Sequence, residues 1–381
     1  MKLFDVYPLY DVEPINAYDC IVVDKNGIEY LDMYGGHAVI SVGHSHPHYV
    51  KKLKEQIEKI GFYSNAVQNS LQSRLAKKLG ELSGYDEYQL FLCNSGAEAN
   101  ENALKLASFY TGKSRVIAFN NGFHGRTSAA VATTDNTKII SPLNAQQDVT
   151  FLPLNEIELV KTELEKGDVC AVIVEPIQGV GGLDEGTTEF FTALETLCHE
   201  FGAVLILDEV QSGFGRSGKF FAHQYHGITP DIISIAKGMG NGFPIGGIMI
   251  APHIEPNYGM LGTTFGGNHL ACIAALSVLE VIETENLIDN TRLTGEYFLS
   301  QVQQIPGLQK VKGKGLMLGL EFDFEVSELR KKMIYDEHIF TGGAMNKKLL
   351  RILPPLTIGR KEIDQFIKAL HNVLVEEKVG L

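Results

Sequence analysis

The fold is decided by residues 203–247, AVLILDEVQSGFGRSGKFFAHQYHGITPDIISIAKGMGNGFPIGG. An apolar run in this stretch ends in Asp208 and Glu209, and a second one, DIISIA, ends in Lys237 before a glycine-rich loop. Short apolar runs with such ends predict strands that are buried on both faces of a parallel sheet. Because ligands bind at the carboxyl ends of the strands in an open parallel sheet, we expect Asp208 and Lys237 to face one crevice.

A carboxylate and an amine in one crevice suit pyridoxal phosphate. Asp208 would hold the pyridine nitrogen protonated, and Lys237 would form the Schiff base that makes the ring an electron sink. The alternatives are a surface lysine at a strand end and a carboxylate bonded to backbone or to an arginine. The spacing of Asp208, Gln211 and Lys237 favours the catalytic interpretation, in which Gln211 bonds the hydroxyl oxygen of the ring.

The alternation of apolar runs and helical patterns extends from residue 88 to about residue 251. It predicts a mostly parallel sheet covered on both faces, which is an α/β fold. We expect strands at 88–93, 115–119, 148–152, 169–175, 203–208, 231–236 and 246–251, and helices at 99–110 and 188–201. Together with two amphipathic helices at about 50–60 and 71–82, these elements predict a large domain at 45–266.

The two ends of the chain predict a smaller α+β domain, made of residues 1–44 together with 267–381. An irregular lead-in precedes two strands at 20–24 and 28–32, which Lys25-Asn26-Gly27 joins as a hairpin turn. The later elements are helices at 270–283, 288–305 and 363–374 and strands around 316–322 and 348–353. The N-terminal strands are expected to complete this second domain.

Composition limits the classes of function. The 381 residues are 44% hydrophobic and 21% charged, which is typical of a folded globular protein. A formal charge of −13 argues against nucleic acid or an anionic membrane as the main partner. The five cysteines form no CxxC pair, and no apolar run is long enough to span a membrane, so we expect a cytoplasmic protein with reduced thiols.

Three further sites carry chemical groups at expected strand ends. Ser95, Gly96 and Ala97 lie where a strand turns into a helix, whose free N–H groups attract a phosphate; an ordinary helix cap by Asn94 or Ser95 is equally expected. Phe123 could stack on a cofactor ring and Arg126 could clamp a carboxylate, although each residue alone is more often structural. Glu175 ends another strand, and a buried carboxylate there needs a partner or a raised pKa.

A histidine cluster offers a different hypothesis, a metal site. His37, His44, His46 and His48 lie close in sequence, and imidazole is a common metal ligand. Pro47 interrupts the alternation, however, and no cysteine or acidic set completes a ligand group. We therefore expect no metal.

Seven motifs occur in order along nearly the whole chain: NSGAEANENALKLA, FHGRT, VEPIQG, ILDEVQSGFGRSGKFFA, SIAKGMGNGFPIGG, GTTFGGNHLA and LLRILPPLTI. Together they resemble the class III aminotransferases of fold type I, closest to the acetylornithine and succinylornithine branch. The resemblance implies pyridoxal phosphate as cofactor and a homodimer with shared active sites. It also implies transfer of the δ-amino group of an N-acylornithine to 2-oxoglutarate in arginine biosynthesis, with ping-pong kinetics.

The resemblance also assigns roles to residues. Lys237 would carry the cofactor, Asp208 would pair with its ring nitrogen, and Phe123 and Gln211 would contact the ring. Ser95, Gly96 and Ala97 would hold the phosphate, with Thr264 reaching it from the other subunit. The substrate would meet Arg126 at its distal carboxylate, Arg351 at its α-carboxylate, and Thr263 alongside.

Two positions depart from the family pattern. His37 stands where relatives that use free ornithine have tyrosine and where the acetylornithine and 4-aminobutyrate enzymes have isoleucine. Val180 stands where a glutamate commonly pairs with the arginine that corresponds to Arg351. A lone buried arginine is costly, so we hypothesise that Arg351 with His37 favours an acyl group that bears its own carboxylate, as in succinylornithine.

Other functions remain open from the sequence. An ornithine or 4-aminobutyrate aminotransferase or an aminomutase would use the same fold with a different substrate end. A metal- or nucleotide-binding protein without covalent cofactor chemistry is a more distant alternative. A mutase forms no glutamate, and a non-covalent binder would keep its ligand after Lys237→Ala.

Overall fold

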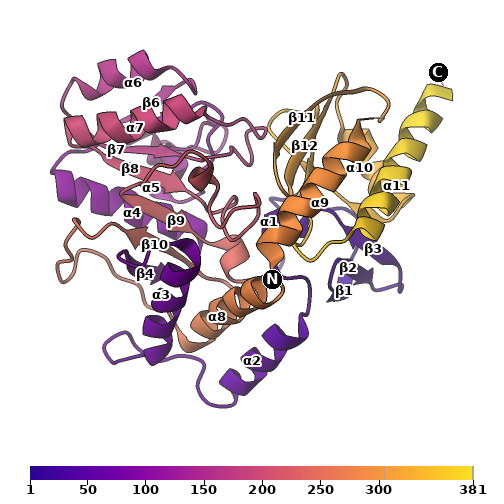
Figure 1. Cartoon of the computed structure of the whole chain (residues 1–381), viewed down its shortest axis with the longest axis horizontal. Coiled ribbons are helices and arrows are strands. Elements are labelled where there is room, and N and C mark those ends of the chain that lie inside the picture. The colour runs from indigo at the N-terminus through magenta and orange to yellow at the C-terminus, as the bar shows by residue number, and fades with distance from the viewer. Residues whose placement is uncertain (304, 380–381) are drawn as a thin grey trace.

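The structure, a computed structural model, describes residues 1–303 and 305–379 (Figure 1). Its centre is a seven-stranded sheet in the order β4-β10-β9-β8-β7-β5-β6. The strands are β4 Gln89–Cys93, β5 Arg115–Phe119, β6 Val149–Leu152, β7 Val169–Val174, β8 Val204–Asp208, β9 Ile232–Ile235 and β10 Gly246–Ile250. β10 runs antiparallel to both of its neighbours and the other pairs are parallel, so the predicted α/β fold with a mostly parallel sheet is confirmed.

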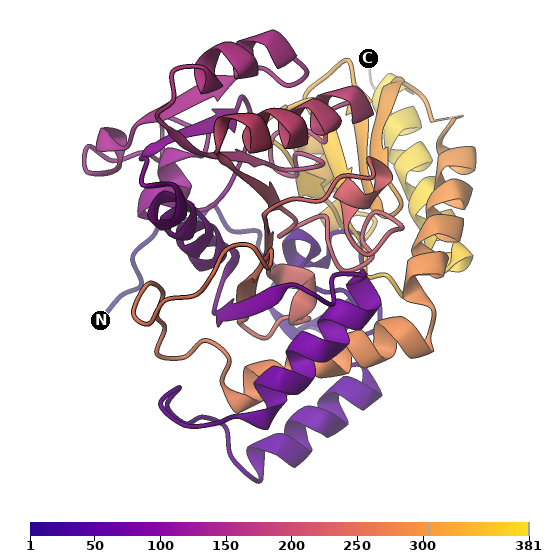
Figure 2. The ribbon, with the colours of Figure 1, turned by 60° about the vertical axis from the view of Figure 1, so that its left-hand side comes forward.

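Helices cover both faces of this sheet (Figure 2). Val204 and Ile206 of β8 pack in one apolar cluster with residues of α4, whereas Leu205 and Leu207 pack in another with residues of α7. This alternation follows from the period-two geometry of a strand that is buried on both faces. The covering helices are α4 Gly96–Thr111, α5 Ser128–Ala132, α6 Ile157–Leu164 and α7 Thr188–Phe201.

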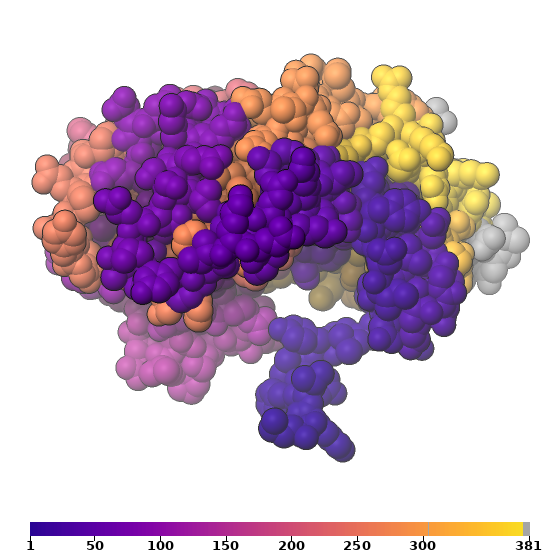
Figure 3. Space-filling view, turned by 90° about the horizontal axis from the view of Figure 1, so that it is seen from below, coloured from indigo at the N-terminus to yellow at the C-terminus, as the bar shows by residue number. Residues whose placement is uncertain are grey.

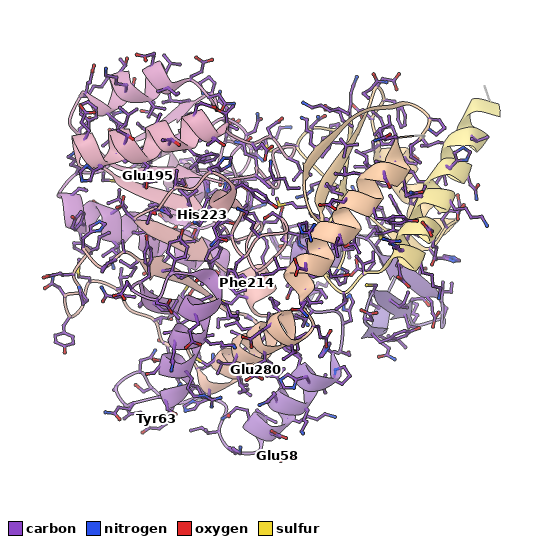
Figure 4. The ribbon with its side chains drawn as sticks, in the orientation of Figure 1. Glu58, Tyr63, Glu195, Phe214, His223 and Glu280 are labelled. Carbon is purple, nitrogen blue, oxygen red and sulfur yellow. The ribbon has the colours of Figure 1, made fainter. Side chains whose placement is uncertain are left out.

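A long buried helix, α8, crosses beneath the sheet and packs against α2 and α3 (Figure 1). The bounds are α2 Pro47–Ile57, α3 Ser70–Ser83 and α8 His269–Thr284. Glu280 of α8 accepts a hydrogen bond from His48 Nε2 of α2 at 2.6 Å (Glu280 is labelled in Figure 4). These contacts attach α8 to helices that precede the central sheet.

Two four-stranded sheets lie beside the central one. The first has the order β1-β2-β3-β13 and the second the order β11-β12-β15-β14. β13 pairs with β3 in parallel, so the N-terminal strands share a sheet with a strand from the C-terminal third. The strands are β1 Pro14–Tyr18, β2 Ile21–Asp24, β3 Glu29–Asp32, β11 Leu308–Lys314, β12 Met317–Phe322, β13 Ile339–Phe340, β14 Gly342–Gly343 and β15 Leu349–Ile352.

The remaining helices are α1 Gly35–Ala38, α9 Leu287–Val302, α10 Ser327–Tyr335 and α11 Arg360–Val379, with 3₁₀ turns at η1 Asn144–Gln146, η2 Ala222–Tyr225 and η3 Lys237–Met239. The first residues of the chain extend away from the body of the molecule (Figure 3). No helix among the described residues is long and apolar enough to cross a membrane. The domain boundaries at residues 45 and 267 stay a prediction.

The prediction of an irregular lead-in was wrong for β1, which forms by pairing with β2 although its sequence, PINAY, has little strand character. Further elements were not predicted, among them α6, α10 and β11. The two helices are short, and β11, LQKVKGK, carries three lysines and lies at the edge of its sheet. β11 is stabilised by its pairing with β12 and not by its own sequence.

Candidate active site

A cavity of about 340 Å³ opens where the strands of the central sheet end. Nine of the predicted site residues line it: Ser95, Gly96, Ala97, Phe123, Arg126, Glu175, Asp208, Gln211 and Lys237. They come from segments up to about 140 residues apart in the sequence, and the shared edge of the sheet brings them together. Val180 also lines the cavity.

Asp208 ends β8 and is only 5% exposed. Its Oδ1 accepts a hydrogen bond from the backbone N–H of Val210 (3.0 Å), and its Oδ2 accepts from Asn100 Nδ2 (2.7 Å) and lies 2.8 Å from His124 Nδ1. Three polar neighbours around one carboxyl group hold it in a fixed orientation. Asp208 therefore presents an oriented carboxyl group to the cavity.

Asn100 and His124, which hold Asp208, were not predicted as site residues. Asn100 is buried, and Ser234 Oγ donates to its Oδ1 at 2.6 Å, which fixes the amide so that its NH₂ points at Asp208. Asn100 stands three and four residues before the buried Ala103 and Leu104, so it is a polar residue on an apolar helix face. That pattern is a signal from which Asn100 could have been found.

Glu209, the neighbour of Asp208, turns away from the cavity. It is fully buried and accepts hydrogen bonds from the backbone N–H of His223 (2.8 Å) and from Ser212 Oγ (2.6 Å), while His223 Nδ1 lies 2.7 Å away (His223 is labelled in Figure 4). This carboxylate is thus occupied by protein groups. Of the two acidic residues that end the apolar run, only Asp208 is available to a ligand.

Lys237 follows β9 and has a left-handed backbone, with φ at +46°. Desolvation lowers the pKa of its amine and Arg351 lowers it further, whereas the negative charges of Asp208 and Glu175 oppose this change. No hydrogen bond or ion pair joins the amine to another residue in the described part of the chain. A buried amine without a partner at a cavity wall is a nucleophile that is available to a ligand.

Glu175 follows β7 and accepts hydrogen bonds from the backbone N–H groups of Phe123 (2.9 Å) and Gly179 (2.8 Å). Burial raises the pKa of this carboxyl to about 7, with nearby His124 opposing the change and Asp208 adding to it. The bond to Phe123 fixes the backbone that carries the ring into the cavity. Glu175 therefore acts on the site by holding Phe123.

Ser95 caps α4, with its Oγ accepting from the N–H of Glu98 at 3.1 Å, and the Glu98 carboxylate in turn accepts from the N–H of Asn94 at 3.0 Å. The helix-cap interpretation of Ser95 is thus correct. The N–H groups of Gly96 and Ala97 still have no acceptor among the described residues, and both residues line the cavity. They are free to bind an anion.

Packing gives one reason for glycine at position 96. A Cβ there would lie 2.6 Å from Val210 Cγ1, so the close side chain of Val210 excludes any larger residue. This glycine therefore has a packing role behind the end of the helix.

Arg351 lies on β15, outside the cavity lining, and is 3% exposed. Its donors reach the carbonyl oxygens of Gly343 (2.6 Å) and Gly179 (2.9 Å) and the oxygens of Gln211 (3.4 Å) and Tyr34 (3.2 Å). All four acceptors are uncharged, and no carboxylate among the described residues pairs with this arginine. Burial lowers the pKa of Arg351, as expected for a cation without an anionic partner.

His37 lies in α1, a single turn in which Gly35, Gly36, His37 and Ala38 all have positive φ. Its carbonyl accepts from Gln211 Nε2 at 3.1 Å, and its Nδ1 lies 2.5 Å from Tyr34 Oη. Desolvation, Arg351, Lys237 and Arg330 together lower the pKa of His37 to about 4, so the ring is neutral at pH 7. Tyr34, which was not predicted, links His37 to Arg351.

Thr263 and Thr264 do not line the cavity of their own chain. Thr263 Oγ1 accepts from the N–H of Gly266 at 3.0 Å and from Asn94 Nδ2 at 3.4 Å, in the loop after β10. The structure therefore does not bring Thr264 together with Lys237 within one chain. Its expected contact with the phosphate of another subunit stays a prediction.

The four histidines of the metal hypothesis diverge. His44, His46 and His48 each contact a different carboxylate, those of Asp32, Glu285 and Glu280 respectively, and His37 turns to Tyr34. In the described ranges, no group of three histidine, cysteine or acidic side chains is arranged to hold a metal ion.

The residues of the cavity fit pyridoxal phosphate. The free N–H groups of Gly96 and Ala97 suit its phosphate, the Asp208 carboxylate suits its ring nitrogen, and the unpaired Lys237 amine suits its aldehyde. Phe123 is half-buried at the cavity wall, where its face is available to a ring. The phosphate, the ring nitrogen and the aldehyde of the cofactor would each meet a complementary group here.

Comparisons with known proteins show what the whole chain is similar to. Residues 9–374 match the model of the family Aminotransferase class-III. The acetylornithine aminotransferase of Bacillus subtilis (strain 168) is 38% identical over 98% of this chain and 97% of its own length. That of Archaeoglobus fulgidus is 40% identical over 93% of both chains. Among solved structures, the ornithine aminotransferase of Toxoplasma gondii ME49 superposes with a TM-score of 0.91 at 26% identity, covering 98% of this chain and 93% of its own.

Proposed function

Because this chain belongs to the class III aminotransferases, we propose that it moves the δ-amino group of an N-acylornithine to 2-oxoglutarate. The products would be the N-acylglutamate semialdehyde and glutamate, a step of arginine biosynthesis. The observation that carries transamination is the unpaired Lys237 amine in one cavity with the fixed Asp208 carboxylate. The choice of an acylornithine rests on similarity to acetylornithine aminotransferases over nearly the whole chain.

The family uses pyridoxal phosphate, which supplies an aldehyde for the substrate amine and a ring that withdraws electrons from the reacting carbon. Gly96 and Ala97 would hold its phosphate, Asp208 its ring nitrogen and Phe123 its ring face. Lys237 Nζ would take the proton from the substrate carbon and return it, as general base and then general acid. The lowered pKa of Lys237 increases the share of neutral amine that this role requires.

Two arginines match the two carboxylates of 2-oxoglutarate. Arg126 is exposed at the cavity wall and has no ion-pair partner among the described residues, so it can clamp a distal carboxylate. Arg351 is fixed behind Gln211 by four neutral acceptors. The α-carboxylate would have to displace the weak contact between Arg351 and Gln211 (3.4 Å) in order to reach the guanidinium.

The lack of a carboxylate partner for Arg351 supports a preference for an acyl group that bears its own carboxylate. The binding free energy at the Arg351 cation gains more from a carboxylate on the acyl group, as in succinylornithine, than from the methyl of an acetyl group. We therefore propose succinylornithine over acetylornithine as the donor. Steady-state kcat/KM for both compounds tests this step, and a strong preference for the acetyl compound would contradict it.

We also propose a cytoplasmic homodimer with shared active sites. The five cysteines are buried free thiols, as suits a reducing compartment. Thr264 lies outside the cavity of its own chain, as a residue that serves another subunit would.

The experiment that tests the function is a half-reaction. Cofactor-loaded enzyme is mixed with N-succinylornithine, N-acetylornithine, free ornithine or 4-aminobutyrate, and the visible absorption of the cofactor is followed. We expect both acylornithines to react faster than the other amines, and glutamate to form when 2-oxoglutarate is then added. Faster reaction of free ornithine or 4-aminobutyrate, or turnover without glutamate, would overturn the proposal.

A further inference from the structure

Two arginines approach Gly343 on β14 from different sides. Arg351 donates from Nε to the carbonyl oxygen of Gly343 at 2.6 Å. Arg330, on α10, places Nη1 only 2.7 Å from the position that a Cβ of residue 343 would occupy. Glycine at this position therefore lets the second guanidinium lie against the strand.

Neither guanidinium has an anion. Among residues 1–303 and 305–379, Arg351 and Arg330 form no ion pair, whereas the buried Arg115 pairs with both Glu163 and Asp168. Arg330 also lowers the pKa of Arg351, which shows that the two charges act on each other. Two adjacent cations without a counterion favour the binding of an anion between or beside them.

Two buried polar atoms beside Arg351 and Arg330 have no hydrogen-bond partner among the described residues. Arg330 donates from Nη2 to the carbonyl oxygen of Thr341 at 3.2 Å, but its Nε is buried without a partner. The hydroxyl of Thr341, a residue that is 2% exposed, is also buried without a partner. Buried polar groups in folded proteins are nearly always bonded, so two such atoms on contacting residues indicate a missing ligand.

The surroundings give this place a fixed shape. A Cβ at Gly342 would clash with the ring of Tyr34. The two glycines of β14 therefore leave room for the Tyr34 ring beside Gly342 and for the Arg330 guanidinium beside Gly343. Tyr34 Oη accepts from Arg351 and lies against Nδ1 of His37, whose ring is neutral at pH 7. Arg330 as a whole is half-buried, and although its Nε is enclosed, its Nη1 makes no hydrogen bond with a described residue.

We propose that Arg330 and Thr341 form a carboxylate subsite beside Arg351 that binds a carboxylate on the acyl group of the amino donor. The free edge of the guanidinium would hold the two carboxylate oxygens, and the Thr341 hydroxyl would donate a further hydrogen bond. This inference rests on the proposed N-acylornithine donor and names the residues that select its acyl group. An acetyl group would leave the subsite empty.

The test uses two unreactive analogues that lack the δ-amine, N-succinylnorvaline and N-acetylnorvaline, which differ in the carboxymethyl group that only the succinyl chain carries. Their binding to cofactor-loaded enzyme is measured by calorimetry for the native chain and for Arg330→Gln, Arg330→Lys and Thr341→Val. Lys331→Gln, at an exposed neighbour that pairs with Glu328, is the matched control. Because binding needs no turnover, the result does not depend on the reaction.

We expect the native enzyme to bind the succinyl analogue about tenfold more tightly than the acetyl analogue, as for one charge-assisted hydrogen-bond pair. Arg330→Gln should abolish this ratio, Arg330→Lys should restore part of it, and Lys331→Gln should preserve it. A native ratio near one, a ratio unchanged in Arg330→Gln, or equal loss of both analogues in both Arg330 variants would overturn the subsite.

Two further measurements separate the possible failures. If Arg330→Gln raises the KM for 2-oxoglutarate and leaves the analogue ratio intact, the carboxylate belongs to the acceptor and the assignment to the acyl group is wrong. If the native enzyme turns over neither acylornithine, the proposed function fails, while the analogue ratio still decides whether the subsite exists.

Discussion

His124 places Nδ1 2.8 Å from Oδ2 of Asp208, and neither side chain is more than 5% exposed. Because Asp208 also accepts from Asn100 and from the backbone of Val210, the carboxyl acts only as an acceptor and Nδ1 is the donor. The imidazole thus orients the carboxylate and supports its negative charge. Asp208 and His124 form one unit.

Substitutions in this unit should not be additive. We expect Asp208→Asn to lower kcat by about 100-fold, because it removes the anion that faces the cofactor. His124→Asn should cost about tenfold, since it disturbs only the orientation and charge of Asp208. The double variant should be no slower than Asp208→Asn, as steady-state kinetics can check. An additive double variant would show that His124 acts by a separate route.

The contact between Gly96 and Val210 predicts a rescue. Gly96→Ala should lower the free energy of unfolding by about 1–3 kcal/mol and weaken cofactor binding, because the new methyl overlaps the Val210 side chain at 2.6 Å. Val210→Ala in the same chain removes the overlap and should recover most of both losses. Denaturant unfolding and cofactor titration measure the two effects. Failure of the second substitution to restore cofactor binding would show that residue 96 must be glycine for the anion itself.

His37 predicts a dependence of stability on pH. Its pKa is about 4 in the fold and about 6.5 in the unfolded chain, so the unfolded state binds more protons between these values. The free energy of unfolding should therefore fall as the pH falls from about 6.5 to about 4. His37→Asn, which tolerates the left-handed backbone, should reduce this loss. His371→Asn, at an exposed position of α11, is the control and should keep the native profile.

The link from Tyr34 to Arg351 predicts an effect on substrate binding. Tyr34→Phe removes the acceptor for Arg351 Nη2 and the contact with His37 Nδ1, so Arg351 loses part of its positioning. We expect the KM for 2-oxoglutarate to rise by about three- to tenfold with a smaller change in kcat. Tyr110→Phe, at an exposed ring, provides the comparison. A fall in kcat alone would assign Tyr34 to the chemistry instead.

The proposed shared site predicts complementation between subunits. Lys237→Ala and Thr264→Ala should each impair a homodimer. In a mixed dimer, one of the two sites would contain both native residues if Thr264 serves the partner, so mixing should recover activity. Turnover of refolded mixtures against each variant alone measures this. No recovery in dimers shown to be mixed would place Thr264 outside the partner's site.

Much of the site follows from the sequence because its residues stand at the ends of buried strands. Asp208 and Lys237 each follow a continuous apolar run, and such runs can be read without tertiary information. Tyr34 could not be found in this way, because its role depends on the approach of Arg351 from β15, 317 residues away. The left-handed turn at His37 was equally hidden, since residues other than glycine, asparagine and aspartate seldom adopt positive φ.

The antiparallel strand β10 has a consequence for how the site can change. Its first residues pair on one side with Cys93, just before the helix end at Gly96 and Ala97 that we propose as the phosphate cradle, and on the other with Ile235, just before Lys237. Backbone hydrogen bonds of β10 to β4 and to β9 therefore fix the distance between the cradle and the Lys237 amine. These bonds do not depend on the side chains. Substitutions can vary what the enzyme recognises, whereas only an insertion or deletion that slips β10 would move the amine relative to the cradle.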